Sequence, residues 1–91
     1  TVKEGAGFTR DYIVNHLESK GIQTRMLFAG NLIKHPCFDE MRKSGEGYRV
    51  VGTLENTDRI MHDTFWVGVY PGLTEGMIEF MVGKIKEFFA R

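Results

Sequence analysis

The chain has 91 residues, of which 42% are hydrophobic, 26% charged and 12% aromatic, and its 12 basic residues balance its 12 acidic ones. This composition is typical of one folded domain, and a chain with no net charge lacks the clustered Lys and Arg that bind nucleic acid or anionic membrane. No apolar run approaches the roughly 20 residues that span a bilayer. We therefore expect neither a nucleic-acid nor a membrane partner.

The only cysteine is Cys37. One cysteine cannot close an internal disulfide, which fits the reducing cytoplasm that we expect as the location. The first residue is Thr rather than Met, and residues 1–4 resemble part of a strand. We therefore expect a single domain, residues 1–91, cut from a longer protein.

The first helix is predicted over residues 10–20. Thr9 is a good N-cap, and Phe8 and Ile13 have the spacing of a hydrophobic staple. Gly21 stands where a left-handed C-terminal cap belongs.

A strand is predicted next, over residues 24–29, with apolar residues on both faces. Arg25 would share one face of this strand with Leu27 and Ala29. Residues 30–47 lose this pattern and contain Pro36 and three glycines, so we interpret them as a long loop with one helical turn. Residues 48–51 are either a short strand or an ordered crossing.

A second helix is predicted to start at Asn56 or Thr57, either of which can cap it, and to run to Asp63. Asp58 would lie favourably at the positive end of that helix. Residues 65–70 are the next predicted strand, ended by a Pro-Gly pair.

The last helix has the strongest pattern. Thr74 is its N-cap, and six apolar side chains form one stripe at helical spacing: Met77, Ile78, Met81, Ile85, Phe88 and Phe89. The order of elements predicts an α+β fold, a small antiparallel sheet with helices covering one face.

The potentially reactive side chains are few and scattered. His35 and Cys37 lie two residues apart, and a metal site would need at least two more ligands. His16 and His62 lie on separate predicted helices without a ligand partner. We expect these four residues to be ordinary surface or edge residues, with no metal site and no catalytic residue in the chain.

Polar residues gather at two places. Arg25, Asn31, Lys34 and His35 lie in or after one strand, and residues 56–59 form a polar stretch at a helix start. Arginine and a helix N-terminus both suit phosphate or carboxylate groups, which favours an anionic ligand. The alternative is that residues 56–58 only cap the helix.

Several longer stretches carry a resemblance to a known family. They are TRMLFAGNL (24–32), YRVVG (48–52), NTDRIM (56–61) and TFWVGVYPGL (64–73). In this order they resemble the carboxy-terminal region of the sugar-nucleotide dehydrases in the DegT/DnrJ/EryC/StrS group of sugar aminotransferase-like proteins. The resemblance spans nearly the whole chain and implies the small domain of the aspartate-aminotransferase fold.

The resemblance implies a parent enzyme of lipopolysaccharide biosynthesis. Such an enzyme uses pyridoxamine or pyridoxal phosphate and an iron–sulfur cluster to remove the 3-hydroxyl of a CDP-linked 4-keto-6-deoxy sugar, on the route to the 3,6-dideoxyhexoses of O-antigen. In the family the cofactor pocket, the catalytic histidine and the cluster cysteines belong to the large domain. We therefore expect no cofactor in this chain and no activity from it alone.

The resemblance also implies partners and substrate contacts. The small domain would pack on the large domain and close one side of the active site, in a parent that is a homodimer and cooperates with a reductase. Arg25, Asn31, His35 and Arg59 are the expected substrate-binding residues, the arginines for phosphate or sugar oxygens and Asn31 for a hydroxyl. Two alternatives stay open: the same domain of a sugar-nucleotide aminotransferase that uses pyridoxal phosphate, and a free-standing α+β interaction module.

Overall fold

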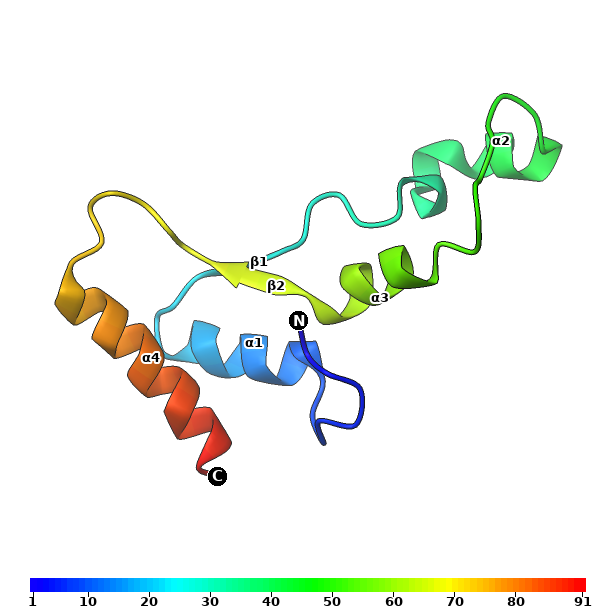
Figure 1. The fold of residues 1–91 in the computed structure, drawn as a ribbon. Helices are drawn as coiled ribbons and strands as arrows, with labels where there is room; N and C mark the ends of the chain where they lie inside the picture. The colour runs from blue at the N-terminus through cyan, green and yellow to red at the C-terminus, as the bar shows by residue number, and fades with distance from the viewer.

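The computed structural model describes all residues from 1 to 91. The fold is α+β, as predicted, with a two-stranded antiparallel sheet and four α-helices (Figure 1). The elements in chain order are α1 (Arg10–Ser19), β1 (Thr24–Met26), the 3-10 turns η1 (Leu32–Lys34) and η2 (Pro36–Phe38), α2 (Asp39–Ser44), α3 (Glu55–Asp63), β2 (Phe65–Val67) and α4 (Glu75–Phe89).

Helix α1 begins where the sequence predicts. The hydroxyl of Thr9 accepts a hydrogen bond from the backbone N–H of Tyr12 at 3.3 Å, and Phe8 packs on the cluster that contains Ile13. Gly21 has a positive φ of 80°, which a residue without Cβ adopts at little cost. The Thr9 N-cap and the hydrophobic staple of Phe8 and Ile13 therefore both stabilise the start of α1, and a left-handed glycine follows the end of this helix.

The two strands are shorter than the predicted ranges 24–29 and 65–70. They pair with Thr24 opposite Val67, Arg25 opposite Trp66 and Met26 opposite Phe65. After Met26 the chain leaves this pairing toward Gly30, whose φ is 78°. A β-strand requires a partner, so the apolar residues beyond Met26 and Val67 remain irregular whatever their propensity.

The core lies between α1, α4 and one face of the sheet. Its buried side chains are Ile13, Leu17, Ile22 and Phe88, with Phe65 and Val67 packed against them from β2. Of the predicted apolar stripe on α4, only Phe88 is buried, while Met81 and Ile85 contribute partly. The prediction of one continuous packed stripe is wrong for the remainder, because a two-stranded sheet is too narrow to cover a helix of 15 residues.

Residues 30–54 form an arm that extends away from this core (Figure 1). The predicted loop contains η1, η2 and the six-residue helix α2, which is more helix than the single expected turn. Residues 48–51 are irregular, so the crossing interpretation holds and the strand interpretation does not.

Helix α3 starts without the predicted cap. Its N-cap is Leu54, which has a positive φ of 57°, and no side chain bonds the first N–H groups. Asn56 and Thr57 lie within the helix, so assigning the cap to either of them was wrong. The positive φ of Leu54 turns the irregular chain sharply into α3, and Glu55 and Asp58 still place negative charge in the first turn.

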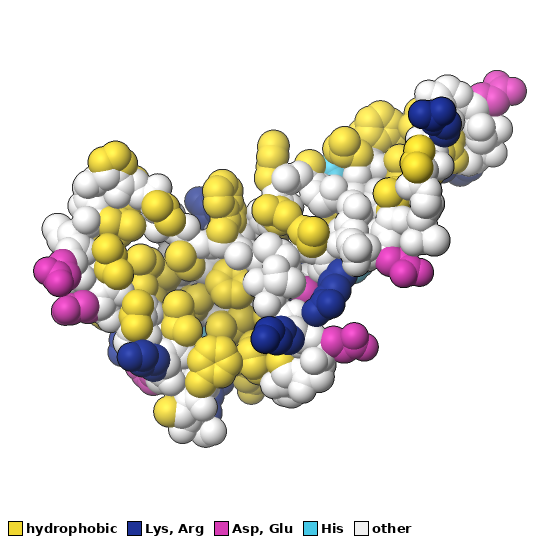
Figure 2. Space-filling view, in the orientation of Figure 1, with side chains coloured by type: hydrophobic (Ala, Val, Ile, Leu, Met, Phe, Trp, Pro, Cys, Tyr) yellow, Lys and Arg dark blue, Asp and Glu magenta, His cyan; other side chains and the backbone are white.

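The molecule is more extended than a compact domain of the same length. Its radius of gyration is 17.1 Å, against about 12 Å for a compact domain of this size. Its accessible surface is 7049 Å², against about 5,400 Å² for a folded monomer of this mass. Only 8 of the 91 residues are buried, and Figure 2 shows hydrophobic side chains spread over α4 and beside the sheet. The surplus surface is as large as that of a protein–protein interface.

Candidate functional site

A buried hydrogen bond joins the segment after β1 to helix α3. Asn31 is 2% exposed, and its side-chain amide donates to Oδ1 of Asp58 at 2.9 Å. Lys34 donates to the other carboxylate oxygen of Asp58, also at 2.9 Å. These two hydrogen bonds hold the pKa of Asp58 below its usual value, and the bond from Asn31 has the larger effect. We call Asn31, Lys34 and Asp58 the latch.

The backbone beside the latch packs closely on α3. A Cβ on Gly30 would lie 2.7 Å from Cγ of Met61, so glycine is needed there for close approach as well as for its positive φ. The backbone N–H of Asn31 points to the Met61 sulfur at 3.3 Å. From the opposite side, Arg10 of α1 donates to the Met61 carbonyl oxygen at 2.6 Å. Helix α3 is therefore held between α1 and the segment that contains the latch.

His35 closes the same segment on itself. Its Nε2 lies 2.6 Å from the carbonyl oxygen of Ala29. Since a carbonyl only accepts, Nε2 carries a proton and donates this hydrogen bond. Arg42 of α2 donates to the carbonyl oxygens of Ile33 and His35. Residues 29–35 thus form a closed turn that is braced on both sides.

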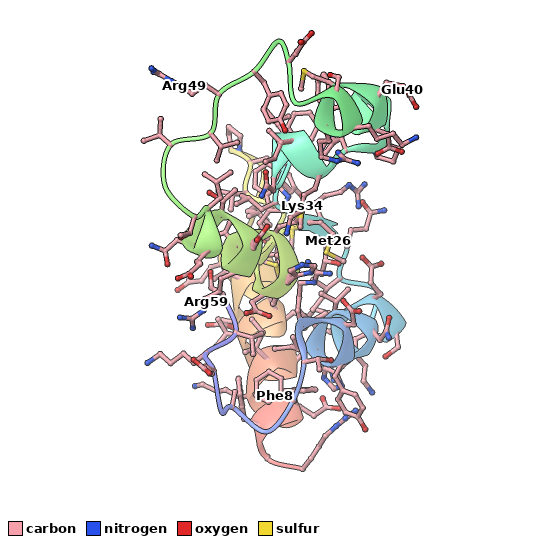
Figure 3. All side chains as sticks on the ribbon, turned by 90° about the vertical axis from the view of Figure 1, so that its right-hand side faces the viewer. Phe8, Met26, Lys34, Glu40, Arg49 and Arg59 are labelled. Carbon is pink, nitrogen blue, oxygen red and sulfur yellow. The ribbon has the colours of Figure 1, made fainter.

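Neither of the two predicted arginine contacts is bonded to the latch. Arg25 is exposed, and its guanidinium donates to the carbonyl oxygen of Thr24 at 2.7 Å. Arg25 and Trp66, which are cross-strand neighbours, line an open concavity of about 330 Å³. Arg59 of α3, labelled in Figure 3, is ion-paired with Asp63 at 3.9 Å. It lines a hollow with residues 2–9, to which Asp58 of the latch also contributes.

The structure therefore divides the four predicted site residues. Asn31 and His35 belong to one braced turn, while Arg25 and Arg59 lie on other surfaces. Asn31 and Asp58 both stand out in the sequence as polar residues, but their contact with each other was not predicted. The available signal was that both residues fall in stretches that carry the resemblance, at 24–32 and 56–61. Nothing in their spacing predicts the contact.

One histidine was wrongly assigned to the surface. His16 is 6% exposed, with Nε2 3.0 Å from the carbonyl oxygen of Lys84 and Nδ1 3.1 Å from the guanidinium of Arg91. It is a core histidine with both nitrogens bonded, and it joins α1 to the end of α4. His62 and Cys37 are exposed, as expected.

The donor set of this chain does not fit the cofactors that the resemblance implies. An iron–sulfur cluster needs several cysteine thiolates, whereas Cys37 is alone and exposed. A pyridoxal phosphate lysine needs an enclosed pocket that lowers its pKa. Every lysine of this chain is exposed except Lys84, which is partly exposed and ion-paired with Glu87. No group of three or more His, Cys, Asp or Glu residues is arranged to hold a metal ion. None of the helices combines the length and apolar character needed to cross a membrane.

Comparison with known proteins gives a consistent assignment. Residues 1–86 match the DegT/DnrJ/EryC1/StrS aminotransferase family. The chain is 48% identical over 91 residues to a dTDP-4-dehydro-2,6-dideoxy-D-glucose 3-dehydratase of Saccharopolyspora spinosa, covering 100% of this chain and 19% of that protein. It is 51% identical over 89 residues to the lipopolysaccharide biosynthesis protein RfbH of Salmonella typhimurium, covering 98% of this chain and 19% of that protein. The chain thus spans about a fifth of the length of these curated relatives.

Proposed function

The chain belongs to the DegT/DnrJ/EryC1/StrS aminotransferase family, and from this premise we propose that it is the carboxy-terminal domain of a CDP-6-deoxy-L-threo-D-glycero-4-hexulose 3-dehydrase of lipopolysaccharide biosynthesis. The observation that carries the proposal is the identity of about one half, over nearly the whole chain, to a sugar 3-dehydratase and to a lipopolysaccharide biosynthesis protein. Identity at this level, together with the small α+β fold, disfavours a free-standing interaction module.

In the proposed parent, the remaining four-fifths of the polypeptide supply the chemistry. That part binds pyridoxamine phosphate and an iron–sulfur cluster, which support removal of the 3-hydroxyl of the CDP-linked 4-keto-6-deoxy sugar, and a partner reductase supplies the electrons. This chain contributes no catalytic group and is inactive alone. The surplus surface of the domain supports this division, because a domain that docks on a larger one leaves such surface uncovered when isolated.

The proposed role of this chain is to close the substrate side of the cleft. Asn31 is buried and bonded to Asp58, so its part is to hold the turn 29–35 in place. His35 and Arg59 are accessible enough for a nucleotide sugar to contact them. Arg25, next to the exposed indole of Trp66, provides a cation and an aromatic surface that suit the phosphates and the flat base of a nucleotide.

One experiment tests the reaction and the substrate together. The full-length parent, loaded with pyridoxamine phosphate and iron–sulfur cluster and given a reductase, is incubated with CDP-4-keto-6-deoxyglucose or with the dTDP-4-keto-2,6-dideoxy sugar. Mass spectrometry should detect the 3-deoxy product from the CDP-linked substrate. If the enzyme instead converts the keto sugar to an amino sugar, with pyridoxal phosphate as cofactor and glutamate as amino donor and without dehydration, the aminotransferase alternative is established. Preference for the dTDP-linked sugar would keep the dehydrase but change its substrate.

A further inference from the structure

We propose that the outer edge of β2 is the seat of a third antiparallel strand, and that the polypeptide immediately preceding Thr1 in the parent protein occupies it. The inference rests on the part of the proposed function that makes this chain one domain of a longer protein. It does not depend on which reaction that protein catalyses.

The sheet has an unfilled edge. It consists of two strands of three residues each, and β2 has β1 on one side only. A two-stranded ribbon of this length is marginal by itself, and a bare strand edge presents backbone groups that pair readily with another strand. The exposed side chains near β2 include Trp66 and Val69, which are 57% and 88% exposed.

The first residues of the chain already lie beside the start of β2. The backbone N–H of Val2 donates to the carbonyl oxygen of Asp63 at 2.9 Å, and the hydroxyls of Thr1 and Thr64 lie 2.7 Å apart. Residue numbers rise on one side as they fall on the other, so the two segments run antiparallel. Figure 1 shows the N-terminus on the side of β2 that faces away from β1. Residues that precede Thr1 would therefore run directly along the outer edge of β2.

The resulting motif is a common supersecondary unit. A strand antiparallel to β2 is parallel to β1, which also pairs antiparallel with β2. The chain would then pass from the new strand through α1 to β1, with β2 inserted between the two parallel strands. This is a split β-α-β unit, in which a helix on one face of the sheet makes the connection. Helix α1 is already packed on that face.

The pairing of Thr1 with Thr64 sets the register. The first residue before Thr1 would lie opposite Phe65, the second opposite Trp66 and the third opposite Val67. Phe65 and Val67 face the core, whereas Trp66 is on the open face with Arg25. Because neighbours across a sheet share a face, the first and third residues should be apolar and packed over α1 and α4.

Chain continuity favours this occupant over a second copy of the protein. Thr1 stands at the entrance of the seat, so a strand from another molecule would collide with the polypeptide that leads into Thr1. This chain covers 19% of the length of each curated relative, so proteins of this kind contain further polypeptide, and the proposed function places it ahead of Thr1. The surplus surface is also large enough for the added strand and the domain behind it.

Disulfide trapping in the full-length parent tests the seat and its register. In a Cys37→Ser background, Trp66→Cys is combined with a cysteine at the second residue before Thr1. Directly opposite residues have Cα separations within the range that a disulfide bridges. The matched control moves the second cysteine to the third residue before Thr1, which points to the other face. Peptide mass spectrometry after mild oxidation should find at least about tenfold more intrachain cross-link in the matched pair.

The remaining outcomes overturn the proposal. A cross-link between two chains would make a second copy the occupant, and equal cross-linking of both pairs, or none, would exclude the register. Because the cysteine variants could fail to fold, hydrogen exchange of the unmodified parent gives a second measurement. The amides of Phe65 and Val67 should face the same outer edge as the Asp63 carbonyl, because backbone groups alternate between the two edges of a strand. They should exchange at least about tenfold more slowly than the amides of residues 45–53, and equal rates would also overturn the seat. Neither readout requires activity, so a failed dehydrase assay leaves this test intact.

Discussion

The side-chain amide of Asn31 donates to the carboxylate of Asp58 across 2.9 Å, and this bond fixes the turn after β1 on helix α3. The two residues are 27 positions apart and lie in separate stretches of the family resemblance. Asn31 is an expected substrate contact and Asp58 an expected charge at the helix start, yet in the structure their side chains bond each other. A buried amide with a carboxylate partner is a positioning device, and the closed turn 29–35 is what it positions.

Exchanging the latch partners tests this assignment. Asn31→Asp places two carboxylates in contact and should lower the melting temperature, whereas the double variant Asn31→Asp with Asp58→Asn restores an amide–carboxylate pair and should recover most of the loss. Asp63→Asn on the same helix is the matched control and should change little, because its ion pair with Arg59 is long and exposed. A double variant no more stable than Asn31→Asp would show that the bond is incidental.

Acid should destabilise the fold through three carboxylates. The pKa of Glu18 is lowered by hydrogen bonds from Thr24, that of Asp58 by Asn31 and Lys34, and that of Glu87 by Lys84 and Lys20. Each folded-state pKa lies below the unfolded value, so the stabilisation is complete above the ordinary carboxyl pKa and is lost as pH falls through the lowered one. Thermal melts between pH 7 and pH 2 should show this loss below about pH 5.

Asp58→Asn gives the control for the acid titration. It removes one of the three groups and should make stability less dependent on pH in the acid range. A melting temperature that stays constant from pH 7 to pH 2 in the unmodified chain would contradict the prediction.

The contribution of α4 depends mainly on Phe88. Its ring is 5% exposed and meets Phe8 at 4.9 Å and His16 at 5.3 Å between centroids. Phe88→Ala should cost about 3–5 kcal/mol of unfolding free energy, measured by urea denaturation. Phe89→Ala should cost much less, because Phe89 is 61% exposed. Equal midpoints for the two variants would mean that α4 is not packed as the structure has it.

The isolated chain should self-associate through its exposed apolar surface. Phe28 and Val69 are 91% and 88% exposed, and exposed apolar surface of this extent promotes association. We expect the 91-residue chain to bind a hydrophobic dye and to self-associate in gel filtration at high concentration. Phe28→Ser should reduce both effects relative to Tyr48→Ser, which changes a less exposed aromatic residue. A strictly monomeric chain that binds no dye would argue against a severed interface.

Arg59 is the substrate contact that kinetics can best isolate. If its guanidinium holds a phosphate or sugar oxygen in the parent, Arg59→Ala loses a charge-assisted bond of about 1.5–3 kcal/mol, or roughly 10- to 150-fold in kcat/KM. The melting temperature should stay nearly constant, since the Arg59–Asp63 pair is exposed. Arg49→Ala, another exposed arginine, is the control. Unchanged turnover in Arg59→Ala would remove Arg59 from the site.

Local signals in the sequence predicted the helix starts that depend on one side chain. Thr9 and Thr74 cap α1 and α4 because a hydroxyl reaches an N–H three residues away, which needs no distant partner. The start of α3 was misplaced because it depends on Leu54 in a left-handed conformation, which no propensity favours. Strand ends were overestimated because they depend on where the partner strand stops.

By itself the sequence determined the α+β class, the family and the N-caps of α1 and α4, since periodicity, capping and motif order are properties of neighbouring residues. Only the tertiary structure decided which apolar side chains are buried, because burial depends on what covers them: Phe88 is enclosed by α1, while Ile78, on the same predicted stripe, is 46% exposed. It also decided that Asn31 bonds Asp58 and that His16 lies in the core. Contacts between residues far apart in the chain follow from how the elements pack, and no spacing within one element encodes them.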